Sequence, residues 1–115
     1  MGGRFVKVEQ KRQGKVLILY VSERLDNLNA HELVKTMTQV IESGEQNLLI
    51  NFEQLTYLSS SGLRVLLGGA KRMETKGGKF MVCSPQKMVK RVIQLVGFDK
   101  VLSVYDSEAE ALQHF

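Results

Sequence analysis

Hydrophobic positions fall into two kinds of run along this chain, short apolar stretches and longer segments with a helical repeat. The short stretches have the length of strands. The most hydrophobic of them, 16–21, has an apolar residue at every position, as expected of a strand that is buried on both faces. A turn at 13–15 separates the first two, which indicates a hairpin. The predicted strands lie at 5–8, 16–21, 48–50, 80–83 and 101–104.

Four longer segments repeat apolar residues with the three- and four-residue spacing of an amphipathic helix. In the first, Asn29 is a candidate N-cap, Glu32 completes a capping-box-like pair, and Gly44 ends the helix. The second follows three serines and ends at 77–78. The third begins with a serine and a proline at 84–85 and ends at 97, and the last begins with a capping box at 107–110.

The element order is therefore β-β-α-β-α-β-α-β-α, with short connections and no internal repeat. Strands that alternate with helices pair in parallel through right-handed crossovers. The sequence thus predicts one α/β domain over residues 1–115, built on a mixed, mostly parallel sheet. We expect the connections at 22–28, 56–61 and 83–85 to converge at the carboxyl end of that sheet, where open α/β folds bind their ligands.

Composition narrows the choice of partners and compartments. The chain has 115 residues, a net charge of +4 and one cysteine, so it has no internal disulfide. Its basic residues are scattered and no aromatic residues are interleaved to stack on bases, so we expect no direct contact with nucleic acid. The longest apolar run is too short to cross a membrane and the start lacks an apolar signal core. We therefore expect a cytoplasmic protein with no membrane partner.

The sequence contains few candidate catalytic groups. His31 and His114 are far apart in sequence and have no neighbouring ligands at metal-binding spacing, and no phosphate-binding glycine loop is present. We therefore expect neither metal nor cofactor, and no enzyme. One alternative is a phosphocarrier or small enzyme that uses Cys83, which leaves a strand just before a helix. The simpler interpretation is a small buried apolar residue.

Three serines and a glycine, 59–62, stand where a strand gives way to a helix. Capping accounts for one serine only. A nucleophile elbow would need a glycine before the serine, and no histidine is placed as a base. A hydroxyl that is modified fits this turn better, because the first turn of a helix tolerates the negative charge of a phosphate.

The helix after these serines offers a candidate docking face. If Leu63 and Leu67 form its buried stripe, the helical period turns Val65, Gly68, Gly69 and Arg72 to the other side. Paired glycines weaken a helix, and close approach by another protein would explain them. The alternative is that these glycines pack inside the domain.

The segment 58–67, Leu-Ser-Ser-Ser-Gly-Leu-Arg-Val-Leu-Leu, resembles the signature of the STAS domain, the fold of bacterial anti-sigma factor antagonists. Segment 22–30, Ser-Glu-Arg-Leu-Asp-Asn-Leu-Asn-Ala, resembles that family's loop between the second strand and the first helix. Segment 97–101, Gly-Phe-Asp-Lys-Val, resembles its entry into the last strand. The similarity covers essentially the whole chain.

The resemblance implies a switch controlled by phosphorylation. In the family, an Asp-Ser-Ser-Gly run carries a phosphorylated serine, the first of the two. By position that serine is Ser60, followed by Ser61 and Gly62, whereas Ser59 replaces the family aspartate. The implied partner is an anti-sigma factor that is itself a serine kinase, which binds the unmodified protein and releases it after phosphorylation.

The expected site therefore combines the phosphoacceptor Ser60 with a surrounding partner surface. Asp26 should lie beside the serines and help to form this surface, although an aspartate that bonds its own backbone is the equal alternative. A nucleotide-binding or other ligand-binding regulatory module is a further alternative function. The expected partner-binding residues are Asp26, Ser59, Ser61, Gly62, Arg64, Val65, Gly68, Gly69 and Arg72.

Overall fold

A six-stranded mixed sheet forms the centre of the computed structural model, which describes residues 6–115. Phe5, expected in the first strand, lies outside the described residues. The strand order is β1-β2-β3-β5-β6, and β4 pairs with β2 off this path. The strands are β1 (Val6–Gln13), β2 (Val16–Leu25), β3 (Asn47–Asn51), β4 (Leu55–Leu58), β5 (Lys79–Cys83) and β6 (Ser103–Tyr105).

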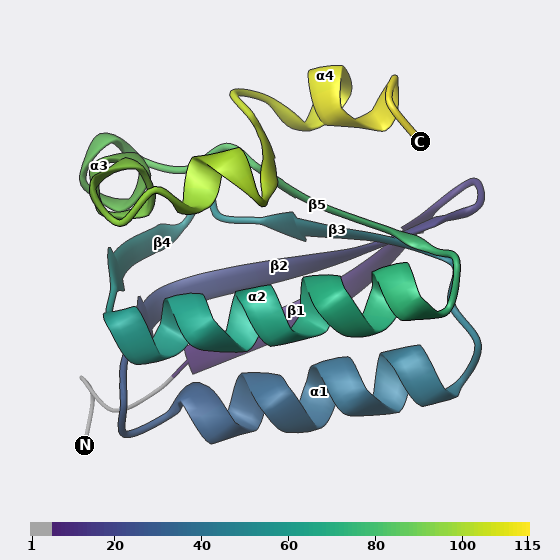
Figure 1. The fold of residues 1–115 in the computed structure, drawn as a ribbon, viewed down its shortest axis with the longest axis horizontal. Helices are drawn as coiled ribbons and strands as arrows, with labels where there is room; N and C mark the ends of the chain where they lie inside the picture. The colour runs from purple at the N-terminus through teal and green to yellow at the C-terminus, as the bar shows by residue number, and fades with distance from the viewer. Residues whose placement is uncertain (1–5) are drawn as a thin grey trace.

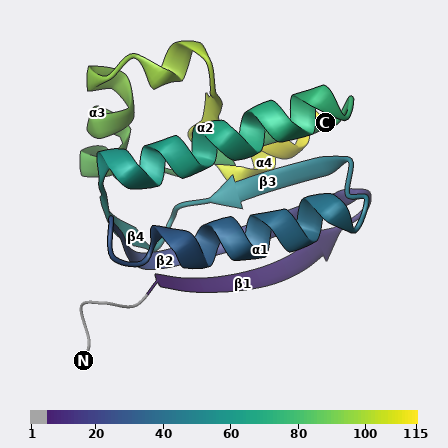
Figure 2. The same ribbon diagram turned by 60° about the horizontal axis from the view of Figure 1, so that its bottom comes forward.

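The helices cover the two faces of this sheet unequally. Two of them, α1 and α2, lie side by side beneath the sheet, whereas α4 lies on the opposite face (Figures 1 and 2). The short α3 packs near β4 at the carboxyl end of the parallel strands, and a 3-10 turn, η1, follows it. Their bounds are α1 (Ala30–Glu42), α2 (Ser60–Thr75), α3 (Lys87–Leu95), η1 (Phe98–Lys100) and α4 (Glu108–Leu112).

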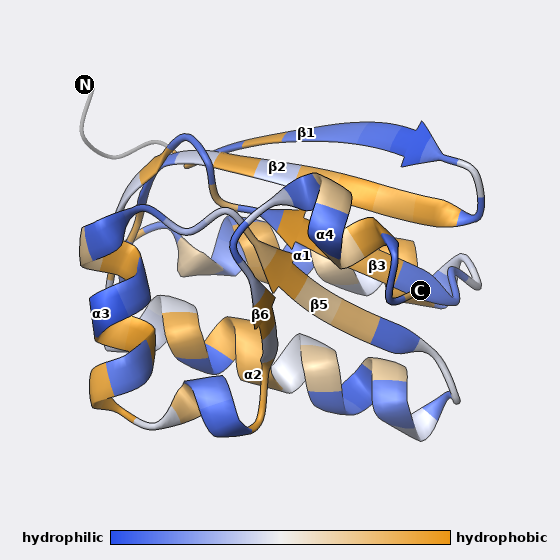
Figure 3. Ribbon diagram, turned by 90° about the horizontal axis from the view of Figure 1, so that it is seen from above, coloured by the Kyte–Doolittle hydropathy of each residue, from blue (hydrophilic) through white to orange (hydrophobic). Residues whose placement is uncertain are grey.

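Alternate residues of the central strands supply two cores. On β2, Leu19 faces α1 and α2 while Ile18 faces α4, and both side chains are fully buried. The same alternation places Ile50 in the larger core and Leu49 in the smaller one. Hydrophobic residues are therefore concentrated in β2, β3 and β5, whereas the edge strand β1 is largely hydrophilic (Figure 3).

The pairing confirms the predicted fold class. β1 and β2 form the antiparallel hairpin, and every other pair in the sheet is parallel. The first half of β2 pairs with β3, and its last residues pair with β4 beyond an irregularity at Glu23 and Arg24. None of the helices within residues 6–115 is long and apolar enough to cross a membrane.

The segment before the serines contains a strand that the sequence pattern did not predict. β4 has two exposed residues, Thr56 and Tyr57, between two buried leucines, Leu55 and Leu58. Such a pattern resembles a polar connection because only the strand ends enter the core. β2 likewise continues to Leu25, four residues past its apolar run, because it pairs with β4 there.

The other boundary differences come from local backbone geometry. The predicted helix start at 84–85 is wrong, because Ser84 adopts a left-handed φ of 59° and α3 begins only at Lys87, after the N-cap Gln86. The last strand begins at Ser103, since residues 98–100 form η1 and leave Val101 exposed. Asn29 is the N-cap residue of α1, but its side chain bonds to the preceding loop, where its oxygen accepts from the Asp26 N–H.

Candidate functional site

The three serines at the start of α2 have different environments. Ser59 is the N-cap: its hydroxyl oxygen accepts a hydrogen bond from the Gly62 N–H at 3.1 Å. Ser61 is half-buried. Ser60, the first helical residue, is exposed, and its hydroxyl has no hydrogen-bond partner within the described part of the chain. One serine therefore builds the turn, and the next presents a free hydroxyl to solvent.

Gly62 is needed for packing. A Cβ atom at this position would lie 2.9 Å from Leu25 Cγ and 2.9 Å from Leu58 Cδ1, well inside normal contact distance. The residue is buried, so α2 approaches the ends of β2 and β4 closely. Gly62 therefore brings α2 close to the strands, and its expected contact with a partner stays a prediction.

Asp26 directly follows Leu25, the last residue of β2. The Leu25 carbonyl accepts a hydrogen bond from the Ser59 N–H in the serine turn. It is 8% exposed, and its Oδ1 accepts from the Leu28 N–H at 2.9 Å and from the Asn29 N–H at 3.3 Å. Its Oδ2 lies 3.8 Å from Arg24 Nε. The structure thus has the alternative arrangement, an aspartate bonded to its own loop, and places that loop beside the serines through the Leu25–Ser59 hydrogen bond.

Two residues that the sequence pattern did not single out complete this surface. The Arg24 guanidinium carbon lies 4.2 Å from the centre of the Tyr57 ring, and both residues are exposed. The irregularity in β2 precedes this contact: Glu23 has a left-handed φ of 73°, and its carbonyl accepts from Thr56 Oγ1 at 2.9 Å. No sequence signal marks such an irregularity, since Glu23 is neither glycine nor asparagine.

The orientation of α2 differs from the expected one. Its buried positions are Gly62, Leu63, Leu66, Gly69 and Met73, while Leu67 is only half-buried. Gly69 faces α1, where an added Cβ would collide with the Met37 methyl group, and Val65 is half-buried against the main core. The prediction that Gly69 and Val65 face away from the core is therefore wrong, and for Gly69 the internal packing alternative is correct.

The outward face of α2 still contains three of the expected positions. Arg64 and Gly68 are exposed, and nothing lies within 4 Å of a Cβ built on Gly68. Arg72 is exposed too, but its Nη1 donates to Thr38 Oγ1 on α1 at 2.9 Å. Among the expected site residues, the free outward surface of α2 therefore consists of Ser60, Arg64 and Gly68, about one turn apart.

The three predicted connections meet only in part. The connections at 22–28 and 56–61 are joined by the hydrogen bond from the Ser59 N–H to the Leu25 carbonyl. The third meets the segment before β4 instead: the Cys83 carbonyl accepts from the Phe52 N–H at 3.0 Å, and Gln86 Nε2 donates to the Glu53 carbonyl at 2.8 Å. Within residues 6–115, residues 83–85 make no hydrogen bond to the serine turn and contact the segment before β4 instead.

Cys83 is unsuited to nucleophilic chemistry. Its side chain is fully buried in the smaller core, and burial raises the pKa of its thiol to about 11, with Glu108 and Glu53 adding to the rise. His31 is exposed on α1, and His114 stacks on Tyr105 with ring centres 4.5 Å apart. Within residues 6–115, no three histidine, cysteine or carboxylate side chains gather as a metal site.

Comparison with known proteins assigns this chain to a family. The model of the STAS domain matches residues 7–111. The anti-sigma F factor antagonist of Paenibacillus polymyxa is 30% identical over 93% of this chain and 92% of its own length. An anti-sigma factor antagonist structure from Mycobacterium paratuberculosis covers 96% of this chain and 94% of its own, with 23% identity and a TM-score of 0.90.

A third similarity, like the second, concerns the fold alone. The structure of the Bacillus cell fate determinant SpoIIAA in its phosphorylated form covers 96% of this chain and 98% of its own, with 21% identity and a TM-score of 0.71. The family match extends from β1 to the last helix and includes the serine turn, Asp26 and the whole of α2. This chain belongs to the STAS domain family.

Proposed function

We propose that this chain is an anti-sigma factor antagonist that works by binding, and that the hydroxyl of Ser60 is its switch. The observation that supports this most directly is the division of roles at the turn, where Ser59 caps α2 and Ser60 presents a free, exposed hydroxyl. The names of the full-length relatives support the same role. The burial of Cys83 argues against the alternative of a phosphocarrier.

The unmodified protein would bind its anti-sigma factor through the surface around Ser60. The exposed outward residues Arg64 and Gly68 continue this surface along α2. The stacked Arg24 and Tyr57 border it on the strand side, because β2 and β4 end beside the turn. Gly68 has no side chain, so a partner can come close to the helix backbone there.

Phosphorylation of Ser60 would break this contact without unfolding the domain. The first N–H groups of a helix have no intrahelical acceptor, so they can bond the phosphate oxygens. The helix dipole contributes about 0.3–1 kcal/mol in the stabilising direction. The disruptive effect must therefore arise at the interface, where a group of nearly two negative charges would lose its water or face a partner carboxylate. The kinase would be the anti-sigma factor itself, in the cytoplasm.

The test is binding of the purified anti-sigma factor kinase to three forms of the protein. Unmodified protein should bind, and Ser60→Asp should bind at least about a hundredfold more weakly, equivalent to about 2.7 kcal/mol. Ser103→Asp is the control, because Ser103 is an exposed serine at the start of β6 and lies away from the serine turn. Phosphosite mapping after incubation with ATP should find Ser60. Phosphate on Ser59 or Ser61 instead, or full binding by Ser60→Asp, would refute the proposed switch.

A further inference from the structure

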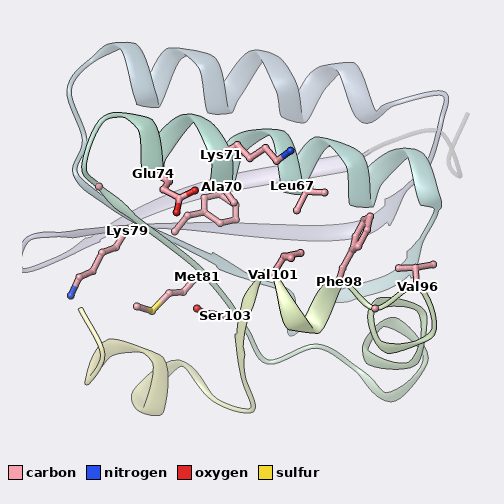
Figure 4. A pocket seen from close by; sticks show the side chains of 13 residues that line it. Leu67, Ala70, Lys71, Glu74, Lys79, Met81, Val96, Phe98, Val101 and Ser103 are labelled. Carbon is pink, nitrogen blue, oxygen red and sulfur yellow. The ribbon is translucent and has the colours of Figure 1, made fainter.

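A groove of about 780 Å³ follows one flank of α2 (Figure 4). Leu67 and Ala70 of α2 form one wall, and Phe98 and Val101, in and after η1, form the other. Phe80 and Met81 of β5 also line it. The groove lies on the side of α2 away from α1, because Gly69 and Arg72 face α1.

The topology leaves this groove open. β6 pairs only with residues 81–83 of β5, so Lys79 and Phe80 have β3 on one side and no strand on the other. The short α3 lies at the carboxyl end of the sheet, so within residues 6–115 only η1 and the residues beside it face this flank of α2 (Figure 1). As a result Val101 is 63% exposed and Val96, which also lines the groove, is 48% exposed. Apolar side chains are thus left uncovered around a concave surface.

The size and lining match those of small-molecule sites, which have volumes of about 300–1,000 Å³, mostly apolar walls and a few polar groups. The polar groups here stand along the rim of α2. Lys71 extends toward Leu67, and Glu74 lies on the other side of Ala70 (Figure 4). Neither side chain has an ion-pair partner within 4 Å among residues 6–115.

Lysine and glutamate thus occupy different parts of the rim, and Lys71 is the cation nearer the apolar walls. An elongated apolar ligand with a negative group at one end would bury its body between α2 and η1 and place its charge beside Lys71. Lys79 adds a second positive charge to the lining, although its Nζ lies 3.4 Å from the His114 carbonyl oxygen. The lining therefore carries two cations against one anion, which favours an anionic ligand over a cationic one.

We propose that this groove binds a free long-chain carboxylate, with its hydrocarbon chain between Leu67 and Val101 and its carboxylate beside Lys71. This proposal does not depend on the function proposed for Ser60. The ligand would contact the same helix that carries the switch serine, on the flank opposite α1.

Titration of the full chain with dodecanoate, below the concentration at which it forms micelles, tests the proposal. Two-dimensional NMR should show saturable binding with shift changes at Leu67, Ala70, Phe98 and Val101. Dodecyltrimethylammonium has a similar tail and the opposite charge, and it should bind at least about threefold more weakly, as expected for an exposed charge contact. Uncharged dodecanol should lie between the two.

Substitutions at the rim separate charge from apolar contact. Lys71→Gln should weaken dodecanoate binding about two- to fivefold, whereas Glu74→Gln should tighten it by a similar factor. Lys11→Gln, at an exposed position on β1, is the control and should leave binding unchanged. Ala70→Phe fills the groove and should abolish binding while the NMR spectrum stays that of the folded domain.

Several results would overturn the proposal. These are the absence of saturable binding, equal affinity for the alkylammonium, tighter binding after Lys71→Gln, or shifts confined to another part of the domain. Shifts at the groove that depend on protein concentration without ligand would point instead to a second copy of the chain as the occupant. A lack of dodecanoate binding would leave the Ser60 experiments unaffected, so the two proposals fail separately.

Discussion

The backbone N–H of Ser59 donates to the carbonyl of Leu25 at 2.9 Å, and this bond attaches the start of α2 to the end of β2. The two residues are far apart in sequence. Leu25 pairs with Leu58 in the parallel ladder, so the bond continues the ladder by one step into the helix N-cap. The aspartate loop and the serine turn are therefore joined by a backbone hydrogen bond, and Ser60 directly follows the residue that donates it.

The two adjacent glycines of α2 should respond oppositely to substitution by alanine. Gly69→Ala places a methyl group against the fully buried Met37, which typically costs about 1–3 kcal/mol and outweighs the helix-propensity gain of up to about 1 kcal/mol. Gly68→Ala adds a methyl group in open space and should stabilise the helix by up to about 1 kcal/mol. Urea denaturation of both variants measures the difference. Equal effects would mean that the orientation of α2 is different from the one described.

The free energy of unfolding should decrease as the pH rises above about 9, because of Cys83. The pKa of its thiol is raised from 9.0 to about 11 by burial, so between these values the unfolded chain loses a proton that the folded chain keeps. The stabilisation is complete below about pH 9, and the free energy of unfolding then drops by about 1.4 kcal/mol per pH unit. Burial and Glu108 also raise the pKa of Tyr20, to about 12, which adds a decline above pH 10.

Urea denaturation at pH 8, 9 and 10 measures this slope. Cys83→Ala is the matched variant, because it removes the thiol and leaves Tyr20 in place. The variant should be less stable at pH 8 but show a shallower decline between pH 9 and 10. Parallel curves for the two proteins would exclude the cysteine as the cause.

The main features of this fold follow from the periodicity of the sequence, and the differences have specific physical causes. The apolar stripe of α1, apart from the exposed Val34, and the cap Ser107 agree with the sequence pattern, because each depends on residues close in the chain. β4 was missed because its pairing with β2 is a long-range contact and its two middle residues face solvent.

In the candidate site, too, some features depend on residues close in the chain and others on long-range contacts. The local pattern places three serines at a strand–helix turn, whereas the choice of Ser60 among them rests on the family motif and stays a prediction. Gly69 is buried because Met37 of the neighbouring α1 packs against it. A helical period shows which residues share a face of the helix, but it does not show which face is buried. The Arg24–Tyr57 contact depends on the left-handed backbone at Glu23, which local sequence preferences disfavour.

Arg64→Glu should weaken binding to the anti-sigma factor with little effect on folding. The side chain is exposed one turn after Ser60, so the free energy of unfolding should change by less than about 0.5 kcal/mol. Reversal of a charge at the proposed interface should raise the dissociation constant severalfold and alter its salt dependence. Lys11→Glu makes the same charge change on β1 and should leave affinity unchanged. Equal loss in both variants would indicate a non-specific charge effect.

Asp26 should tolerate asparagine better than alanine. Asn keeps a side-chain oxygen for the Leu28 and Asn29 N–H groups, whereas Ala leaves them without their acceptor, which typically costs about 1–3 kcal/mol. Thermal unfolding compares the two variants. If Asp26→Asn also keeps full partner affinity and full phosphorylation, then Asp26 shapes the loop and its charge has no part in the interface.

The last prediction separates the capping serine from the modified one. Ser59→Ala removes the acceptor for the Gly62 N–H and should destabilise the domain by about 0.5–2 kcal/mol. Ser60→Ala removes a hydroxyl that faces solvent and should change stability by less than about 0.5 kcal/mol. Phosphate transfer should show the reverse order: Ser60→Ala should abolish it, and Ser59→Ala should retain it at a temperature where the variant is fully folded. Ser107→Ala, which removes the equivalent cap of α4, controls for loss of a cap at a distance from the site. If Ser59→Ala lost phosphate transfer and Ser60→Ala kept it, Ser59 would be the phosphoacceptor and the proposed roles would be wrong. Modification of the capping hydroxyl would then remove the N-cap of α2.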